Sequence, residues 1–90
     1  MEHNTQLFLE IVTPQKILFR SEIELVHIPG AGGSFSILRG HAPIIAGIKP
    51  GVIRVIGLHG GENLFQCDEG VVECNQNQIT ILIERGSELK

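Results

Sequence analysis

Histidines are the residues of this 90-residue chain whose type most suggests a chemical site. They are His3, His27, His41 and His59. No two of them have a His-x-His or His-x-x-x-His spacing, the local pattern of many metal sites. The sequence therefore predicts no metal centre and no catalytic residue. The alternative from the enzyme class is a small metal-dependent β-barrel that uses His27, His41 and His59.

Two cysteines and one glycine-rich loop are the other candidates for chemistry. Cys67 and Cys74 flank a predicted turn around residues 68–70, so they either lie opposite each other on a hairpin or are simply two small reduced residues; the second interpretation is favoured. The loop 30–34, Gly-Ala-Gly-Gly-Ser, superficially resembles a phosphate-binding loop. However, neither a lysine in P-loop spacing nor a helix follows it, so we expect a turn and no bound cofactor.

Composition excludes further classes of function. The chain is 42% hydrophobic, has a formal charge of −3 and contains four Phe but neither Trp nor Tyr. Its lysines and arginines are scattered, whereas nucleic-acid binding requires clustered cations. No apolar run reaches the roughly 18 residues that span a bilayer, and the N-terminus lacks the pattern of a signal peptide. We therefore expect no membrane insertion, and any link to a membrane has to pass through a protein partner.

The elements that position these residues are predicted to be short strands. Isoleucine and valine dominate, and apolar residues recur at period two between glycine and proline breaks, which is typical of strands and turns. The predicted strands are 6–13, 16–20, 23–28, 35–38, 44–48, 52–58, 62–67, 70–75 and 78–83. Eight to ten short strands without room for crossover helices predict an antiparallel sandwich or small barrel.

Three details complete this prediction. Ile23 and Leu25 are expected on one face of their strand, with Val26 and Ile28 on the other. Pro50 followed by Gly51 fits a type II turn. Residues 85–90 are expected to form a short polar tail.

The turn 39–43, Arg-Gly-His-Ala-Pro, is the best candidate for recognition by sequence alone. It combines a glycine for an unusual backbone angle, a polar histidine at the tip and a proline at the exit. Such a protruding turn is ordered before a partner arrives, which lowers the entropic cost of binding. Loops on a rigid sheet are also where recognition commonly occurs.

The order of several segments around this turn resembles one family. They are LFLEIVTP at 7–14, ILRGHAPII at 37–45, IKPGVIR at 48–54, EGVVEC at 69–74 and NQITIL at 77–82. Together they are similar to the N-terminal domain of the epsilon subunit of F-type ATP synthases, from about residue 7 to residue 84.

The resemblance implies a single domain over residues 1–90, an all-β flattened antiparallel sandwich of about ten short strands in two five-stranded sheets. It implies a non-catalytic subunit of the rotor's central stalk in a proton-translocating ATP synthase, at the cytoplasmic face of the bacterial inner membrane. The implied partners are the gamma subunit and the polar loops of the c-ring. The implied contacts with the c-ring polar loops, on the side of the c-ring and gamma, are Ala31, Gly32, Gly33, Ser34, Arg39, Gly40, His41 and Ala42.

This chain departs from the family pattern at three places. Arg39 stands where the family usually has proline, and Ser34 stands where an acidic residue is common. Typical epsilon subunits also continue as a helical hairpin that inhibits hydrolysis, whereas this sequence stops at Lys90. We expect a short form that couples ion flow to synthesis without inhibition by helix extension. The alternative is a freestanding β-sandwich module for protein interaction.

Overall fold

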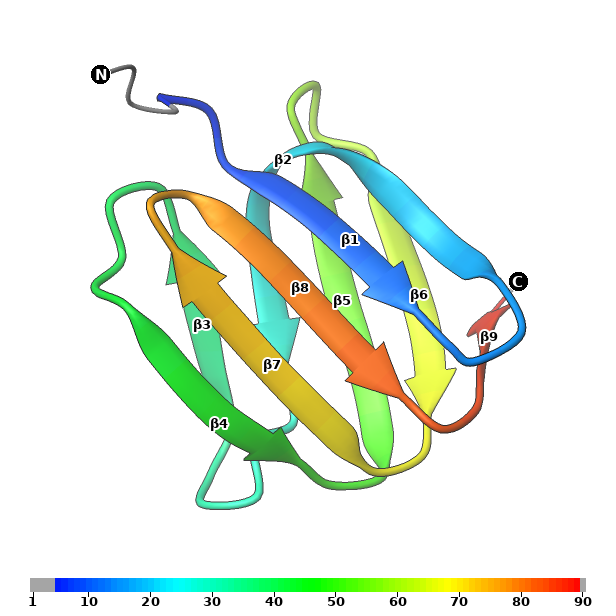
Figure 1. Cartoon of the computed structure of the whole chain (residues 1–90). Coiled ribbons are helices and arrows are strands. Elements are labelled where there is room, and N and C mark those ends of the chain that lie inside the picture. The colour runs from blue at the N-terminus through cyan, green and yellow to red at the C-terminus, as the bar shows by residue number, and fades with distance from the viewer. Residues whose placement is uncertain (1–4, 90) are drawn as a thin grey trace.

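Nine strands make up the ordered elements of the chain in a computed structural model that describes residues 5–89 (Figure 1). The strands are β1 Phe8–Val12, β2 Ile17–Ile28, β3 Phe35–Leu38, β4 Ile44–Ile48, β5 Gly51–Gly57, β6 Glu62–Cys67, β7 Gly70–Asn75, β8 Gln78–Ile83 and β9 Gly86–Leu89. The described residues contain no helix, and thus none long and apolar enough to cross a membrane.

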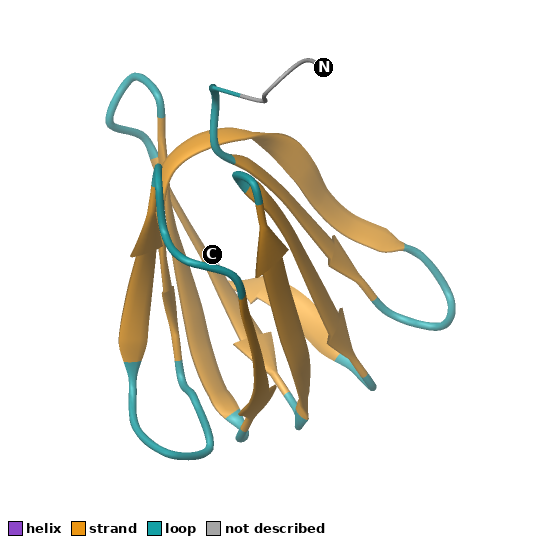
Figure 2. Ribbon diagram, turned by 60° about the vertical axis from the view of Figure 1, so that its left-hand side comes forward, coloured by secondary structure: helices purple, strands orange, loops and turns teal. Residues whose placement is uncertain are grey.

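The strands form one continuous sheet that folds over on itself into two layers (Figure 2). The first layer contains β4, β7, β8, β1 and the first half of β2; the second contains β3, the second half of β2, β5, β6 and β9. The predicted all-β sandwich is therefore confirmed. Two separate five-stranded sheets are not confirmed, because the long strand β2 belongs to both layers.

Strand β2 joins two predicted strands, 16–20 and 23–28, and it bends through two bulges. Its pairing shifts at Leu18 against β1 and at Glu24 against β5, where one extra residue of β2 is accommodated each time. A bulge bends a strand and changes which residues share a face. As a result Ile23 and Val26 are both buried in the core, and the predicted opposition of their faces is wrong.

Two further pairings differ from the prediction. β1 and β8 run parallel, whereas the other strand pairs of the described residues are antiparallel. The expected polar tail is also wrong for residues 86–89, which form edge strand β9 against β6; Lys90 lies outside the described residues. The segment Gly-Ser-Glu-Leu has no alternation of apolar residues because a polar edge strand is held by its backbone hydrogen bonds.

The turn between β4 and β5 is not the predicted type II turn. That type requires a positive φ at Gly51, but Gly51 does not have one and is instead the first residue of β5. A Cβ at this position would lie 3.0 Å from Cβ of Pro29. Glycine is needed here for close approach of the two segments and not for a left-handed backbone.

The core lies between the two layers and consists of the inward side chains of both. β8 illustrates the pattern, with Ile79, Ile81 and Ile83 buried and the residues between them outward. Phe65 of the second layer packs edge-on against Phe19 of β2, with ring centroids 5.7 Å apart. Burial of this aliphatic surface is the main force that holds the layers together.

Candidate functional site

The predicted contact residues fall into two loops that lie at opposite ends of the sandwich. The loop 30–34 connects β2 to β3, and the turn 39–43 connects β3 to β4. Because β3 runs the length between them, the loop is at the lower end of Figure 1 and the turn at the upper end. The structure therefore does not bring the two segments together.

The loop 30–34 has an anchored base and an exposed tip. Gly30 forms a β-bridge with Ile48, and the Ala31 amide donates to the carbonyl of Gly47 at 2.9 Å. The Gly33 amide donates to the carbonyl of Gly30, and Gly33 has a φ of 133° that strongly favours glycine. Residues 31–34 are all exposed. The tip is thus held in one conformation while its surface remains accessible.

The turn 39–43 is also fixed by hydrogen bonds. Gly40 has a φ of 85°, as the sequence predicted from its glycine. The His41 amide donates to the carbonyl of Leu38 at 3.1 Å, and His41 Nδ1 lies 2.7 Å from the carbonyl oxygen of Ala42. Because a carbonyl only accepts, Nδ1 carries the proton and this tautomer holds the imidazole against the turn.

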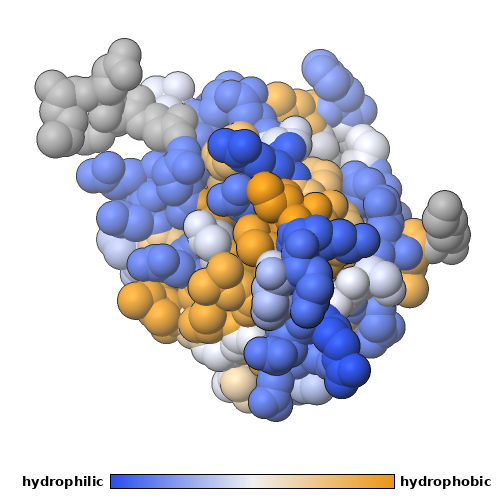
Figure 3. Space-filling model, turned by 45° about the vertical axis from the view of Figure 1, so that its right-hand side comes forward, coloured by the Kyte–Doolittle hydropathy of each residue, from blue (hydrophilic) through white to orange (hydrophobic). Residues whose placement is uncertain are grey.

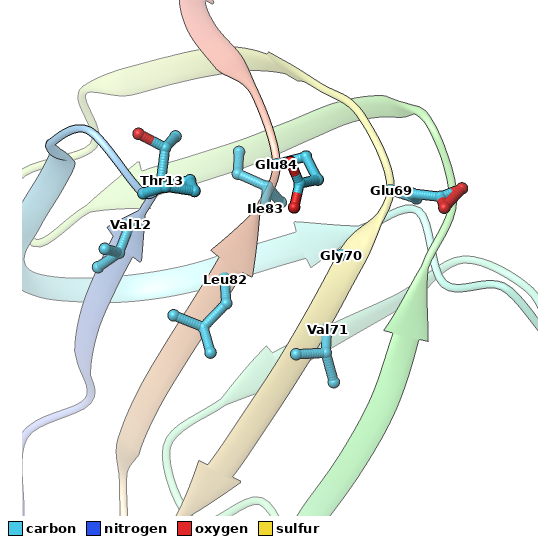
Figure 4. Close-up of a pocket in the computed structure, with 9 residues that line it drawn as sticks. Val12, Thr13, Glu69, Gly70, Val71, Leu82, Ile83 and Glu84 are labelled. Atoms are coloured by element: carbon cyan, nitrogen blue, oxygen red, sulfur yellow. The ribbon is translucent and has the colours of Figure 1, made fainter.

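An apolar row crosses the outer face of the first layer, and we call it the outer row. Strand pairing places its members side by side on consecutive strands from β4 to β2: Gly47, Val71, Leu82, Val12 and Ile17. Figure 4 shows the side chains of Val71, Leu82 and Val12 on the same side of three neighbouring strands. With strands about 4.8 Å apart, five positions span about 19 Å. The row is therefore a continuous surface and not a set of isolated residues.

The surroundings of the outer row extend this surface and give it an acidic rim. A shallow hollow of about 360 Å³ lies over the row, and its lining includes the carboxylate residues Glu69 and Glu84 at one end. One row further along, Ile45 of β4 is 73% exposed, the highest value among the exposed large hydrophobic residues. Figure 3, viewed from the side of the β1–β2 connection, shows apolar surface gathered in the middle with polar side chains around it. Exposed apolar surface with a polar border is typical of a docking site.

The polar part of the same face is organised by β1 and β2. Arg20 forms an ion pair with Glu10 at 3.5 Å, and its guanidinium lies 5.8 Å from the centre of the Phe8 ring. Both charges are partly in solvent, so this pair adds little to stability. It does fix the polar border on one side of the apolar surface.

The outer face of the second layer is more mixed. Leu38, Leu25 and Ile56 are neighbours across β3, β2 and β5 at the upper end. Beside them His27 Nδ1 lies 2.9 Å from Ser36 Oγ, and Arg54 forms an ion pair with Glu62. Polar pairs thus interrupt the aliphatic surface on this face.

The candidate residues for chemistry are dispersed. His27, His41 and His59 come from a strand, a turn and a loop, while His3 lies outside the described residues. Within residues 5–89 no three His, Cys, Asp or Glu side chains are grouped as metal ligands.

Both cysteines are free and buried in the core. The possibility that they face each other on a hairpin is wrong, because β6 and β7 belong to different layers and pair with other strands. Burial raises the pKa of both thiols. For Cys67, a hydrogen bond from the Gly51 backbone lowers the pKa in part, whereas the negative charge of Asp68 raises it further. Thiols of this kind are poor nucleophiles.

Sequence reasoning missed the outer row, although a signal for it was present. Residues 71–72 and 81–83 are unbroken apolar runs, so β7 near its start and β8 near its end are apolar on both faces. A strand with two apolar faces is expected where both faces are covered.

Comparison with known proteins identifies relatives along nearly the whole chain. The profile of the beta-sandwich domain of the ATP synthase delta/epsilon chain matches residues 6–88. The ATP synthase epsilon chain of Chlorobaculum tepidum is 42% identical over 79 residues, which cover 88% of this chain and 90% of that relative. The epsilon chain of Campylobacter fetus subsp. fetus is 32% identical over 78 residues, which cover 87% of this chain but 60% of its own length.

Solved structures with the same fold come from mitochondrial ATP synthases. A chain of the Euglena gracilis enzyme, in a structure of OSCP, F1 and c-ring, matches with a TM-score of 0.88 and 17% identity over 98% of this chain and 56% of its own length. A chain from the central stalk and c-ring of the Tetrahymena thermophila enzyme matches with a TM-score of 0.75 and 14% identity over 94% of this chain and 68% of its own. At these identities the likeness concerns the fold.

Proposed function

This chain belongs to the family of ATP synthase delta/epsilon chains, and we propose that it is a non-catalytic epsilon subunit in the central stalk of a proton-translocating F-type enzyme. In this role it binds the gamma subunit and the c-ring and helps to couple ion flow to ATP synthesis. The observation that carries the proposal is the 42% identity to a named epsilon chain over most of both proteins. The fold shared with a chain from a central stalk and c-ring structure supports it.

The gamma subunit is the partner that we assign to the outer face of the first layer. This face carries the outer row and Ile45, and the latter follows the turn 39–43 by two residues. Ile45 therefore lies between the turn, at the upper end of the molecule, and the outer row, which crosses the other end of the layer where the Ala31 amide donates to the carbonyl of Gly47. Apolar area of this extent suits a permanent neighbour in an assembly.

The polar loops of the c-ring are the partner that we assign to the loop 30–34. Its exposed tip at the opposite end from the turn leaves room for gamma and the ring to be bound at the same time. Ser34 supplies a hydroxyl where the family commonly has an acidic residue, so its contact is a neutral hydrogen bond. The subunit reaches the cytoplasmic face of the membrane through these protein contacts.

Site-directed cross-linking tests both the role and the orientation. Ser34→Cys carries a photoreactive maleimide in ATP synthase assembled on membranes, and the matched control is His59→Cys in the exposed β5–β6 turn at the other end. The buried native thiols do not compete for the reagent. We expect a cross-linked product with subunit c from position 34 and none from position 59.

The opposite result separates the alternatives. Equal or absent cross-linking at both positions refutes the assignment of the loop to the c-ring. A chain that also fails to co-purify with gamma is not a stalk subunit, and a freestanding interaction module then becomes the better interpretation.

A further inference from the structure

The turn between β7 and β8 has an unusual sequence for its backbone geometry. Gln76 and Asn77 link the paired residues Asn75 and Gln78 and have φ values of 50° and 64°. Two consecutive positive φ angles in a two-residue hairpin define a type I′ turn, which favours Asn followed by Gly. Here the second position carries asparagine, so a side chain is present where glycine suits the turn best.

The side chain of Asn77 has a specific partner far away in the sequence. Its Oδ1 accepts a hydrogen bond of 2.8 Å from the backbone amide of Gly40, which is 37 residues away, and its own carbonyl accepts the amide of Phe8 at 2.8 Å. An amide donor requires the oxygen of the asparagine, so the orientation of the side chain is defined. Through these two hydrogen bonds Asn77 links the turn 39–43 to the start of β1.

This bond differs from the others that hold the turn 39–43. The bonds of His41 run to Leu38 and Ala42 and close the turn on itself, so they leave its position relative to the sandwich open. The bond from Gly40 to Asn77 joins the turn to the first layer. The turn also carries the exposed, charged side chain of Arg39, which forms no ion pair within the described residues.

We propose that Asn77 is a positioning residue that holds the turn 39–43, and with it Arg39 and His41, in the orientation that the gamma subunit binds. The inference rests on the proposed function of this chain. An asparagine in a position that favours glycine destabilises the hairpin, and the hydrogen bond from the Gly40 amide offsets this loss.

Two glycine substitutions in the same turn test the proposal. Asn77→Gly removes the acceptor while keeping the positive φ, and Gln76→Gly is the matched control because it makes the same change one residue earlier. Asn77→Asp restores an acceptor oxygen in a residue that also tolerates the left-handed region. Each variant is compared with the wild-type chain by amide exchange at Gly40, by thermal unfolding and by affinity for purified gamma subunit.

We expect Asn77→Gly to exchange the Gly40 amide about three- to tenfold faster and to bind gamma about three- to tenfold more weakly, as for one lost hydrogen bond. Its thermal unfolding midpoint stays at or above that of the wild type, because glycine suits the turn. Gln76→Gly and Asn77→Asp keep wild-type exchange at Gly40 and wild-type affinity.

Different outcomes refute different parts of this reasoning. Wild-type affinity of Asn77→Gly, or equal weakening by Asn77→Gly and Gln76→Gly, refutes the role of Asn77 while the proposed function stands. A wild-type chain that does not bind gamma refutes the proposed function and the binding role of Asn77 together. In that case the exchange rate at Gly40 still reports whether the bond anchors the turn.

Discussion

Truncation of two side chains on the outer face of the first layer measures how gamma docks there. Leu82 is 49% exposed and Ile45 is 73% exposed in the free chain. Full burial of such a side chain contributes about 1.5–3 kcal/mol, so covering the exposed parts contributes about 0.7–1.5 kcal/mol for Leu82 and about 1.1–2.2 kcal/mol for Ile45. The two positions lie two strands and one row apart, at about 12 Å, where effects generally add.

The double variant Leu82→Ala and Ile45→Ala is therefore expected to weaken gamma binding by about 20- to 500-fold. Isothermal titration calorimetry with purified gamma subunit measures this directly. Leu89→Ala is the matched control, because Leu89 is 41% exposed but belongs to β9 in the second layer, and it is expected to bind like the wild type. All three substitutions are at exposed positions, so each lowers the free energy of unfolding by less than about 1 kcal/mol.

The reasoning fails if the double variant binds gamma with wild-type affinity while remaining folded by circular dichroism. It also fails if Leu89→Ala weakens binding as much, because the docking surface would then lie on the other layer or on both.

Three further predictions concern the stability and reactivity of the isolated chain. Gly70→Ala places a Cβ 2.1 Å from the carbonyl oxygen of Leu82, so it is expected to lower the free energy of unfolding by about 1–3 kcal/mol or more in urea titrations. Gly32→Ala is the control, because no atom lies within 4 Å of its Cβ. An equal loss of unfolding free energy in both variants would contradict the close approach of Gly70 to Leu82. Ile81→Ala opens a core cavity and is expected to cost about 2–5 kcal/mol, whereas Leu82→Ala next to it costs less than about 1 kcal/mol; similar losses would mean that β8 is not one-sided. Because burial raises the pKa of both cysteine thiols above 9.0, they should resist Ellman's reagent at pH 8 in the folded chain and react at once in denaturant. The stability that the neutral thiols contribute is complete below pH 9.0 and is lost as the pH rises through the higher folded-state pKa, so an increase of stability with pH in that range would contradict it.

Much of the strand pattern was predictable because it depends on local signals. Six of the predicted strand ranges agree closely with the observed strands. Five of them agree to the residue, namely 35–38, 44–48, 62–67, 70–75 and 78–83. Alternation of apolar residues defines a strand with one buried face, and glycine and proline define its ends. The family resemblance rests on the same local segments, and the match to residues 6–88 confirms it.

The remaining features depend on contacts between residues far apart in the sequence. The bulges of β2 are required for one strand to serve two layers, and nothing in residues 17–28 alone marks where the sheet folds over. Edge strand β9 has no apolar alternation, because backbone pairing with β6 holds it. The predicted contact turns looked like neighbours along the chain, but an extended strand of four residues separates them in space.

The amino-acid sequence by itself determined the class of fold, the family and the positions of most turns, because these follow from the period of apolar residues and from local backbone preferences. Only the tertiary structure decided which residues share a surface. It aligned Val71, Leu82 and Val12 into one row, placed the loop 30–34 and the turn 39–43 at opposite ends, and joined Asn77 to Gly40. The physical reason is that strand register and layer packing are set by the whole core, so a pattern within one segment does not specify them.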